Sequence, residues 1–133
     1  RISEDALKKI GVGVTYLAMI RRILKECGFD ARIRSSLKGA SGNVHNFDII
    51  AEKGGFLLVI DVSSEGREED LLRLLGKKID TKPAGSLLVT ISNYAGVSSL
   101  GKVYGISVIR AGSEGELESN LRAFLKGRRD GSR

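Results

Sequence analysis

A pair of glycines between two apolar runs constrains the fold of this chain more than any other feature. Residues 47–52 and 56–62 have the composition of strands, and Gly54-Gly55 lies between them. A two-residue glycine turn joins such runs as a β-hairpin. Both faces of this hairpin are apolar. The sheet that contains it therefore needs helices above and below.

The rest of the chain alternates between helical and extended patterns. Helical spacing of apolar residues covers four stretches and extended patterns cover three more, namely helices over 3–27, 68–78, 96–105 and 114–125, and strands over 30–37, 86–92 and 106–109. The order αβββαβαβα predicts a three-layer α/β/α domain around a five-stranded mixed sheet. We expect one domain over residues 1–125, followed by a basic flexible tail over residues 126–133.

Composition excludes several classes of protein. The 133 residues suit a single domain, and no apolar run approaches the roughly 18 residues that cross a bilayer. The single cysteine, Cys27, excludes a disulfide framework and a Cys-rich zinc site, and is expected to be a small core residue. With no signal peptide visible, the expected location is cytoplasmic. The net charge of +6 permits an acidic partner such as nucleic acid.

The hairpin register brings two acidic residues together. Asp48 and Asp61 each lie six residues outside the glycine turn, so they are directly opposed and point to the same face. Ser63 continues that face. Two carboxylates this close repel unless a cation neutralises them, which makes the pair a candidate Mg²⁺ site. Alternatively, they are strand-end acids that pair with arginines.

The residues around this pair resemble a known motif. Asn46-Phe-Asp48-Ile-Ile-Ala, the glycine turn and Val59-Ile-Asp61-Val-Ser63 resemble the PD-(D/E)XK nuclease superfamily, the restriction-endonuclease-like fold of archaeal Holliday junction resolvases and Mrr-like enzymes. The later strands, 87–92 and 104–109, extend the resemblance over most of the chain. It implies that Asp48 and Asp61 are catalytic metal ligands of an Mg²⁺-dependent endodeoxyribonuclease, and that Ser63 stands at the third catalytic position.

Two groups that the resemblance implies are absent. Family enzymes place a lysine two residues after the second acid, where this chain has Ser63, and the first helix usually supplies a glutamate that residues 11–22 lack. Some members place the lysine on the next helix, so Arg67, Arg73 or Lys77 could substitute. We therefore expect a catalytically degenerate nuclease-fold domain that binds nucleic acid, DNA more than RNA, or a partner protein. The alternatives are an active Mg²⁺-dependent endonuclease and a structural subunit.

Basic side chains supply the expected contacts to phosphate. Arg32, Arg34 and Lys38 should lie beside the acidic pair, with Lys77 on the following helix. Any of these positions can equally be a solvated surface. His45, the only histidine, is predicted to be a loop or surface residue on the opposite face from Asp48. A closed two-fold homodimer is the expected assembly.

Overall fold

Four helices and five strands follow one another in the predicted order. The computed structural model describes the backbone of residues 4–92 and 96–131, and the side chains of residues 13–92 and 96–127. The elements are α1 (Glu4–Glu26), β1 (Asp30–Lys38), β2 (Val44–Lys53), β3 (Phe56–Ser63), α2 (Glu68–Thr81), β4 (Gly85–Thr90), α3 (Val97–Tyr104), β5 (Ser107–Arg110) and α4 (Glu114–Gly131).

Most boundaries agree with the prediction within two residues, and three differ by more. Helix α2 ends at Thr81, three residues later than expected. Strand β2 begins at Val44, three residues earlier than expected. Helix α4 continues past Leu125 to Gly131, so the segment predicted as a flexible tail is helical as far as Gly131. Residues 132–133 of that predicted tail lie outside the described residues.

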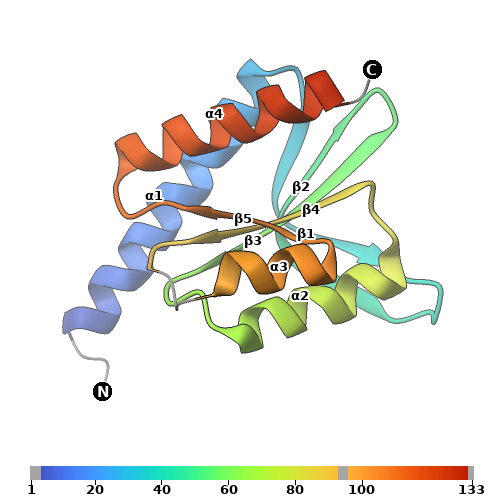
Figure 1. The fold of residues 1–133 in the computed structure, drawn as a ribbon, viewed down its shortest axis with the longest axis horizontal. Coiled ribbons are helices and arrows are strands. Elements are labelled where there is room, and N and C mark those ends of the chain that lie inside the picture. The colour runs from blue at the N-terminus through green and yellow to red at the C-terminus, as the bar shows by residue number, and fades with distance from the viewer. Residues whose placement is uncertain (1–3, 93–95, 132–133) are drawn as a thin grey trace.

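The five strands form one mixed sheet in the order β1-β2-β3-β4-β5. The first three strands are antiparallel neighbours, whereas β3, β4 and β5 run parallel. Helices α1 and α4 cover one face of the sheet and α2 and α3 cover the other (Figure 1). The predicted three-layer α/β/α architecture is confirmed. Within the described residues, no helix is long and apolar enough to cross a membrane.

Each face of the sheet has its own hydrophobic core. The core under α1 and α4 contains Ile20, Leu24, Ile49, Leu58, Ile60, Leu87, Leu117 and Leu121, with Cys27 packed against it. The core under α2 and α3 contains Phe47, Ile50, Val59, Leu71, Leu74, Leu88, Val97 and Ile106. Because both faces are buried, the central strands are apolar on both sides, as the hairpin sequence indicated.

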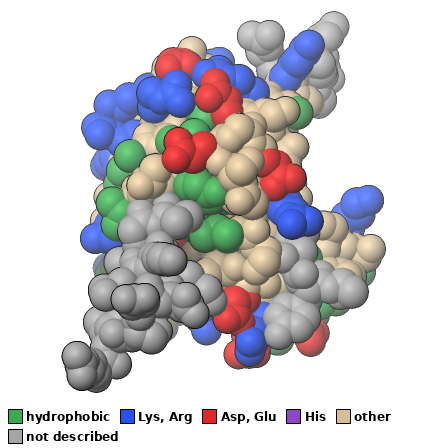
Figure 2. All heavy atoms as spheres, turned by 90° about the vertical axis from the view of Figure 1, so that its left-hand side faces the viewer, with side chains coloured by type: hydrophobic (Ala, Val, Ile, Leu, Met, Phe, Trp, Pro, Cys, Tyr) green, Lys and Arg blue, Asp and Glu red, His purple; other side chains and the backbone are tan. Residues whose placement is uncertain are grey.

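Charged side chains join α1 to α4 on the outside of the first layer. Arg122 donates hydrogen bonds to Glu26 at 2.6 Å and to Glu118 at 3.0 Å, and Arg22 lies 2.9 Å from Glu26. These two arginines lower the pKa of Glu26, with the bond from Arg122 as the larger cause. Figure 2 shows basic and acidic side chains interleaved on the upper part of one face, where α4 lies.

The glycine turn sets the register of the β2–β3 hairpin. Gly54 and Gly55 both have positive φ, +55° and +82°, which is the backbone of a two-residue hairpin turn. Lys53 pairs with Phe56, and the ladder continues to the pair Ile49 and Ile60. The predicted register is therefore confirmed up to this pair.

Strands β1 and β2 change faces where the ladder to β3 ends. Ile49 packs in the α1/α4 core, yet Phe47, two residues away, packs in the α2/α3 core. In the same way, Ile33 packs on the first core and Leu37 on the second. A regular strand keeps residues i and i+2 on one face, so both strands rotate around Arg34 and Asp48. This rotation turns the open end of the hairpin, away from the glycine turn, toward α2.

Candidate functional site

Strands β2 and β3 separate at the two acidic residues, and side chains replace the backbone ladder there. The amide of Asp48 donates a hydrogen bond to Asp61 Oδ1 at 3.0 Å, and the amide of Val62 donates one to Asp48 Oδ2 at 2.7 Å. Each carboxylate thus accepts a bond from the opposite strand. The two acidic side chains lie next to each other, as the register predicted.

A lysine from α2 neutralises Asp61. Lys77 Nζ donates a hydrogen bond to Asp61 Oδ2 at 2.5 Å and another to the carbonyl oxygen of Asn46 at 2.7 Å. It also lies 4.6 Å from the centre of the Phe47 ring, within the range of a cation–π contact. The side chains of Lys77 and Asp61 are each 17 % exposed, so solvent screens this ion pair only in part.

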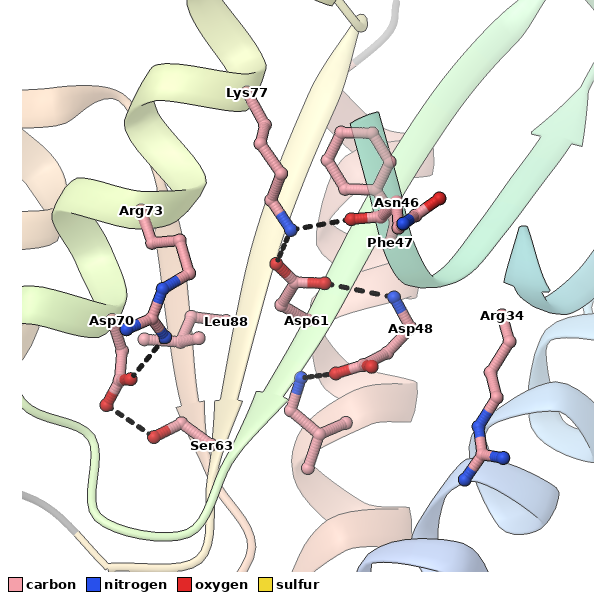
Figure 3. Close-up of a pocket in the computed structure, with 11 residues that line it drawn as sticks. Arg34, Asn46, Phe47, Asp48, Asp61, Ser63, Asp70, Arg73, Lys77 and Leu88 are labelled. Carbon is pink, nitrogen blue, oxygen red and sulfur yellow. Dashed lines mark hydrogen bonds and ion pairs between the residues drawn. The ribbon is translucent and has the colours of Figure 1, made fainter. Parts of the chain in front are cut away.

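These residues line a cavity of about 580 Å³ between α2, the middle of β1, the first half of β2 and the end of β3. Its polar lining comprises three basic side chains, three acidic ones and two neutral ones, namely Arg34, Arg73, Lys77, Asp48, Asp61, Asp70, Asn46 and Ser63. Arg73 and Lys77 reach in from α2 on one side, and Arg34 lies on the other side of Asp48 (Figure 3). We call this cavity the α2 pocket.

Ser63 holds the start of α2 against the sheet. Its hydroxyl donates to Asp70 Oδ2 at 2.6 Å and accepts a bond from the Gly66 amide at 2.9 Å. Asp70 also accepts from the Arg67 amide at 2.9 Å and lies 3.4 Å from Arg73. Ser63, a candidate catalytic residue, therefore positions the helix that carries Lys77.

Two features of the connection between β3 and α2 require a glycine at position 66. Its φ is +61°, and a Cβ atom there would lie 2.7 Å from the carbonyl oxygen of Ser92. The end of β4 packs against this loop because the Ser92 amide donates to the Ser64 carbonyl. A side chain at position 66 would push the two segments apart and move α2.

Arg34 has a strained backbone at the edge of the pocket. Its φ is +52°, a left-handed conformation that a residue with a long side chain rarely adopts. Its neighbours Ile33 and Ser35 pair with β2, whereas Arg34 falls at the interruption of the ladder next to Asp48. Strained residues of this kind concentrate at functional sites, because the surrounding structure must hold them there.

Burial raises the pKa of the Asp48 carboxyl, and the neighbouring charge of Asp61 raises it further. The hydrogen bond from the Val62 amide and the charges of Lys77 and Arg34 act in the opposite direction. The net shift is upward because burial is the largest cause. Asp48 is thus a carboxyl group that gains from a proton or from an added cation.

The carboxylate oxygens of Asp48 and Asp61 fit a magnesium ion only in part. Three of the four carboxylate oxygens of Asp48 and Asp61 accept a hydrogen bond within the protein. Among the described side chains, no group of three or more His, Cys, Asp or Glu residues is arranged to hold a metal. An ion bound by both acids would have to displace Lys77 from Asp61.

The structure brings together only some of the predicted phosphate-binding residues. Arg34 and Lys77 line the α2 pocket. Arg32 does not line it, and lies 3.8 Å from Asp30 in an exposed ion pair. Lys38 ends β1, where it pairs with Val44 and is exposed. Arg73, weighed only as a substitute for the lysine, lines the pocket, as does Asp70, which sequence reasoning missed.

His45 lies on strand β2 and is partly buried, so it is not the loop or surface residue that the sequence predicted. Its Nε2 lies 2.7 Å from Asp80 Oδ2, at the end of α2, and its side chain is 22 % exposed. Asp80 also accepts bonds from the Ser41 hydroxyl at 2.6 Å and the Ser41 amide at 2.9 Å. These bonds lower the pKa of Asp80 to about 2, with the Ser41 hydroxyl as the largest cause, followed by His45 and then the Ser41 amide. Asp80 thereby fastens the β1–β2 loop to α2.

Comparison with known proteins finds a similar fold in a protein whose function is unknown. No family model and no curated protein matches this chain. Three solved chains match its fold. One is the crystal structure of a protein of unknown function, AF1548, with a TM-score of 0.59 and 15 % identity over 71 % of this chain. This chain spans 57 % of the length of that protein.

Proposed function

We propose that this chain is a nuclease-fold domain that binds the phosphate backbone of nucleic acid at the α2 pocket without relying on a metal ion. The observation that carries the proposal is the ion pair between Lys77 and Asp61. In the motif that this sequence resembles, the second acid binds a metal, and here an ammonium group neutralises it. The three basic side chains of the pocket balance its three acidic ones, so the site does not need a metal ion for neutralisation.

The basic side chains are arranged for phosphate oxygens. Arg34 and Arg73 approach the cavity from two different elements, so a backbone lying across it meets cations on both sides. Arginine donates paired hydrogen bonds that match a phosphate group, and Lys77 adds a point charge. The acidic pair then has a positioning role, because Asp61 holds the Lys77 side chain.

Duplex DNA is the favoured ligand class. Sequence-tolerant binding of single strands uses aromatic side chains on which bases stack. This chain has three Tyr, four Phe and no Trp, and the pocket's aromatic residue, Phe47, is buried in the α2/α3 core. Charge without stacking groups favours a paired backbone over unpaired bases.

Fluorescence anisotropy with labelled DNA in the presence of EDTA tests the proposal. We expect Arg73→Gln and Lys77→Gln each to weaken duplex binding about three- to tenfold at low salt, and to make the salt dependence shallower by about one unit. Lys102→Gln removes the same charge from an exposed position on α3 outside the pocket and should bind like the parent chain. Equal losses in all three variants, or binding that does not depend on salt, would refute a phosphate site here.

The second candidate function is Mg²⁺-dependent cleavage of DNA. It is favoured by the adjacency of Asp48 and Asp61 and by the raised pKa of Asp48. These two carboxylates would hold the ion, which would supply charge neutralisation and an activated water. Calorimetry with Mg²⁺ or Mn²⁺ should then detect binding that Asp48→Asn abolishes, and duplex or branched DNA should be cut. Metal binding together with cleavage would replace the first proposal with this one.

A further inference from the structure

The polar groups that line the α2 pocket divide into those that the protein uses itself and those that it leaves to a ligand. Both carboxylate oxygens of Asp61 accept hydrogen bonds, one from the Asp48 amide and one from Lys77. The carboxylate of Asp70 and the hydroxyl of Ser63 are likewise occupied by neighbouring groups. These bonds fix the walls of the pocket, so a ligand meets the remaining groups.

The remaining groups lie on strands β1 and β2. Asp48 Oδ2 accepts a hydrogen bond from the Val62 amide, whereas Asp48 Oδ1 accepts none from any residue that the structure describes. The side chains of Arg34 and Asn46, which also line the pocket, make no hydrogen bond or ion pair within the described part of the chain. Arg34 lies next to Asp48 on the side away from α2 (Figure 3). An unused cation and an unused acceptor thus adjoin each other.

The unused oxygen of Asp48 is unfavourable for a ligand that consists of phosphate alone. A phosphate attracted by Arg34 and Arg73 displaces water from Asp48 Oδ1, and a phosphodiester has no hydrogen to donate in return. A carboxylate oxygen that loses its water without gaining a donor weakens binding. The deoxyribose-phosphate backbone inside a strand contains no hydrogen-bond donor at all. The group bound here should therefore carry a hydroxyl close to its phosphate.

The end of a DNA strand has this combination of groups. A terminal sugar carries a free hydroxyl at C3′ and a phosphate at C5′, or the reverse at the other end of the strand. One nucleotide therefore presents both a donor for Asp48 and an anion for the arginines. The cavity volume of about 580 Å³ lies in the range of sites that enclose small ligands. A cavity of this size suits one terminal nucleotide better than a length of duplex.

We propose that the α2 pocket binds the end of a DNA duplex, with the terminal sugar hydroxyl donating a hydrogen bond to Asp48 Oδ1 and the adjoining phosphate bound by Arg34 and Arg73. This inference rests on the proposed function, because it names the part of the duplex that enters the same site. Asp48 is then a specificity-determining residue, which disfavours an internal phosphate and favours a strand end. Asn46 lines the same side with an amide that can donate or accept.

Fluorescence anisotropy with four DNA duplexes of one sequence, in the presence of EDTA, tests this proposal. One duplex is closed by a loop at both ends, and one is open but has 5′-phosphates and dideoxy 3′ ends, so that it carries no terminal hydroxyl. The other two carry hydroxyls at their 3′ ends only or at their 5′ ends only. We expect one of these two to bind about tenfold more tightly than the closed and hydroxyl-free duplexes, because it alone donates to a charged acceptor. The comparison between the two shows which end enters the pocket.

Two variants assign the preference to Asp48. Asp48→Asn keeps an oxygen for the Val62 amide and presents an NH₂ group, which cannot accept a bond from a hydroxyl, in place of the unused oxygen. This variant should keep the circular dichroism spectrum of the parent chain and lose the preference for hydroxyl-bearing ends. Arg73→Gln is the matched control, because it should weaken binding of every duplex and leave the preference unchanged.

The outcomes separate this inference from the proposed function. Open and closed duplexes that bind the parent chain equally would overturn the inference while the phosphate site stands. A preference for hydroxyl-bearing ends that persists in Asp48→Asn would also overturn it. If no duplex binds the parent chain in a salt-dependent manner, the proposed function fails and this inference fails with it.

Discussion

Lys77 Nζ lies 2.5 Å from Asp61 Oδ2, so the ammonium group of α2 and the carboxylate of β3 form a mostly buried ion pair in the lining of the α2 pocket. Removing one partner leaves the other charge poorly compensated. We expect Lys77→Gln to lower the free energy of unfolding by about 2 kcal/mol, measured by urea denaturation.

A double-mutant cycle isolates the pair itself. Asp61→Asn combined with Lys77→Gln should cost less than the two single substitutions added together, because neither charge is then left alone. Strict additivity would show that the two side chains do not interact in solution.

The raised pKa of Asp48 gives the protein a pH dependence of definite sign. A carboxyl whose folded-state pKa lies above its ordinary value stabilises the fold fully below pH 3.8, and this stabilisation is lost as the pH rises through the folded-state pKa. Asp48→Asn keeps an oxygen that can accept from the Val62 amide and removes the charge. We expect this variant to be more stable than the parent at pH 7.

Urea unfolding at pH 3 and pH 7 checks this expectation. The difference between Asp48→Asn and the parent should shrink at pH 3, where the parent carboxyl is also protonated. An equal difference at both pH values would mean that the charge of Asp48 costs the fold nothing.

Two substitutions at Arg34 separate the effect of backbone strain on stability from the effect of the guanidinium on binding. Glycine adopts positive φ without steric cost, whereas alanine does not. We expect Arg34→Gly to unfold with a free energy about 1 kcal/mol higher than Arg34→Ala. Both variants lack the guanidinium and should lose duplex binding equally in the anisotropy assay. If the two variants bind differently, the backbone at this position contributes to binding beyond its charge.

Gly66 sets the position of α2. Gly66→Ala combines a positive φ with a contact to the Ser92 carbonyl and should lower the free energy of unfolding by about 2 kcal/mol or more. Gly115→Ala provides the matched control, because a Cβ atom there meets nothing within 4 Å. The control should change stability by less than about 1 kcal/mol, as measured by thermal and urea unfolding.

Local patterns in the sequence were sufficient to predict the sheet and the acidic pair. The turn at Gly54-Gly55 fixes the register within a few residues. The proximity of Asp48 and Asp61 therefore follows from their equal distance from the turn in the sequence. The element order likewise follows from helical and extended periodicity. Both predictions depend on contacts between residues close together in the chain.

The rest of the site depends on contacts that no local pattern contains. Lys77 reaches Asp61 because Leu71 and Leu74 fix the rotation of α2 on the sheet, and three candidate side chains could not be ranked without that rotation. Asp80 meets Ser41 and His45 across more than 30 residues of chain. The change of faces at Arg34 is likewise invisible in an alternating sequence.

The separation of β2 from β3 has one more consequence. Beyond Asp48, residues 44–47 of β2 hydrogen-bond to β1 on one side only, and the other side is an open sheet edge that can template strand addition and aggregation. Lys77 covers part of that edge, because its ammonium group occupies the carbonyl oxygen of Asn46 that an incoming strand would need. The lysine that pairs with Asp61 thus also removes one hydrogen-bond acceptor from this edge of the sheet.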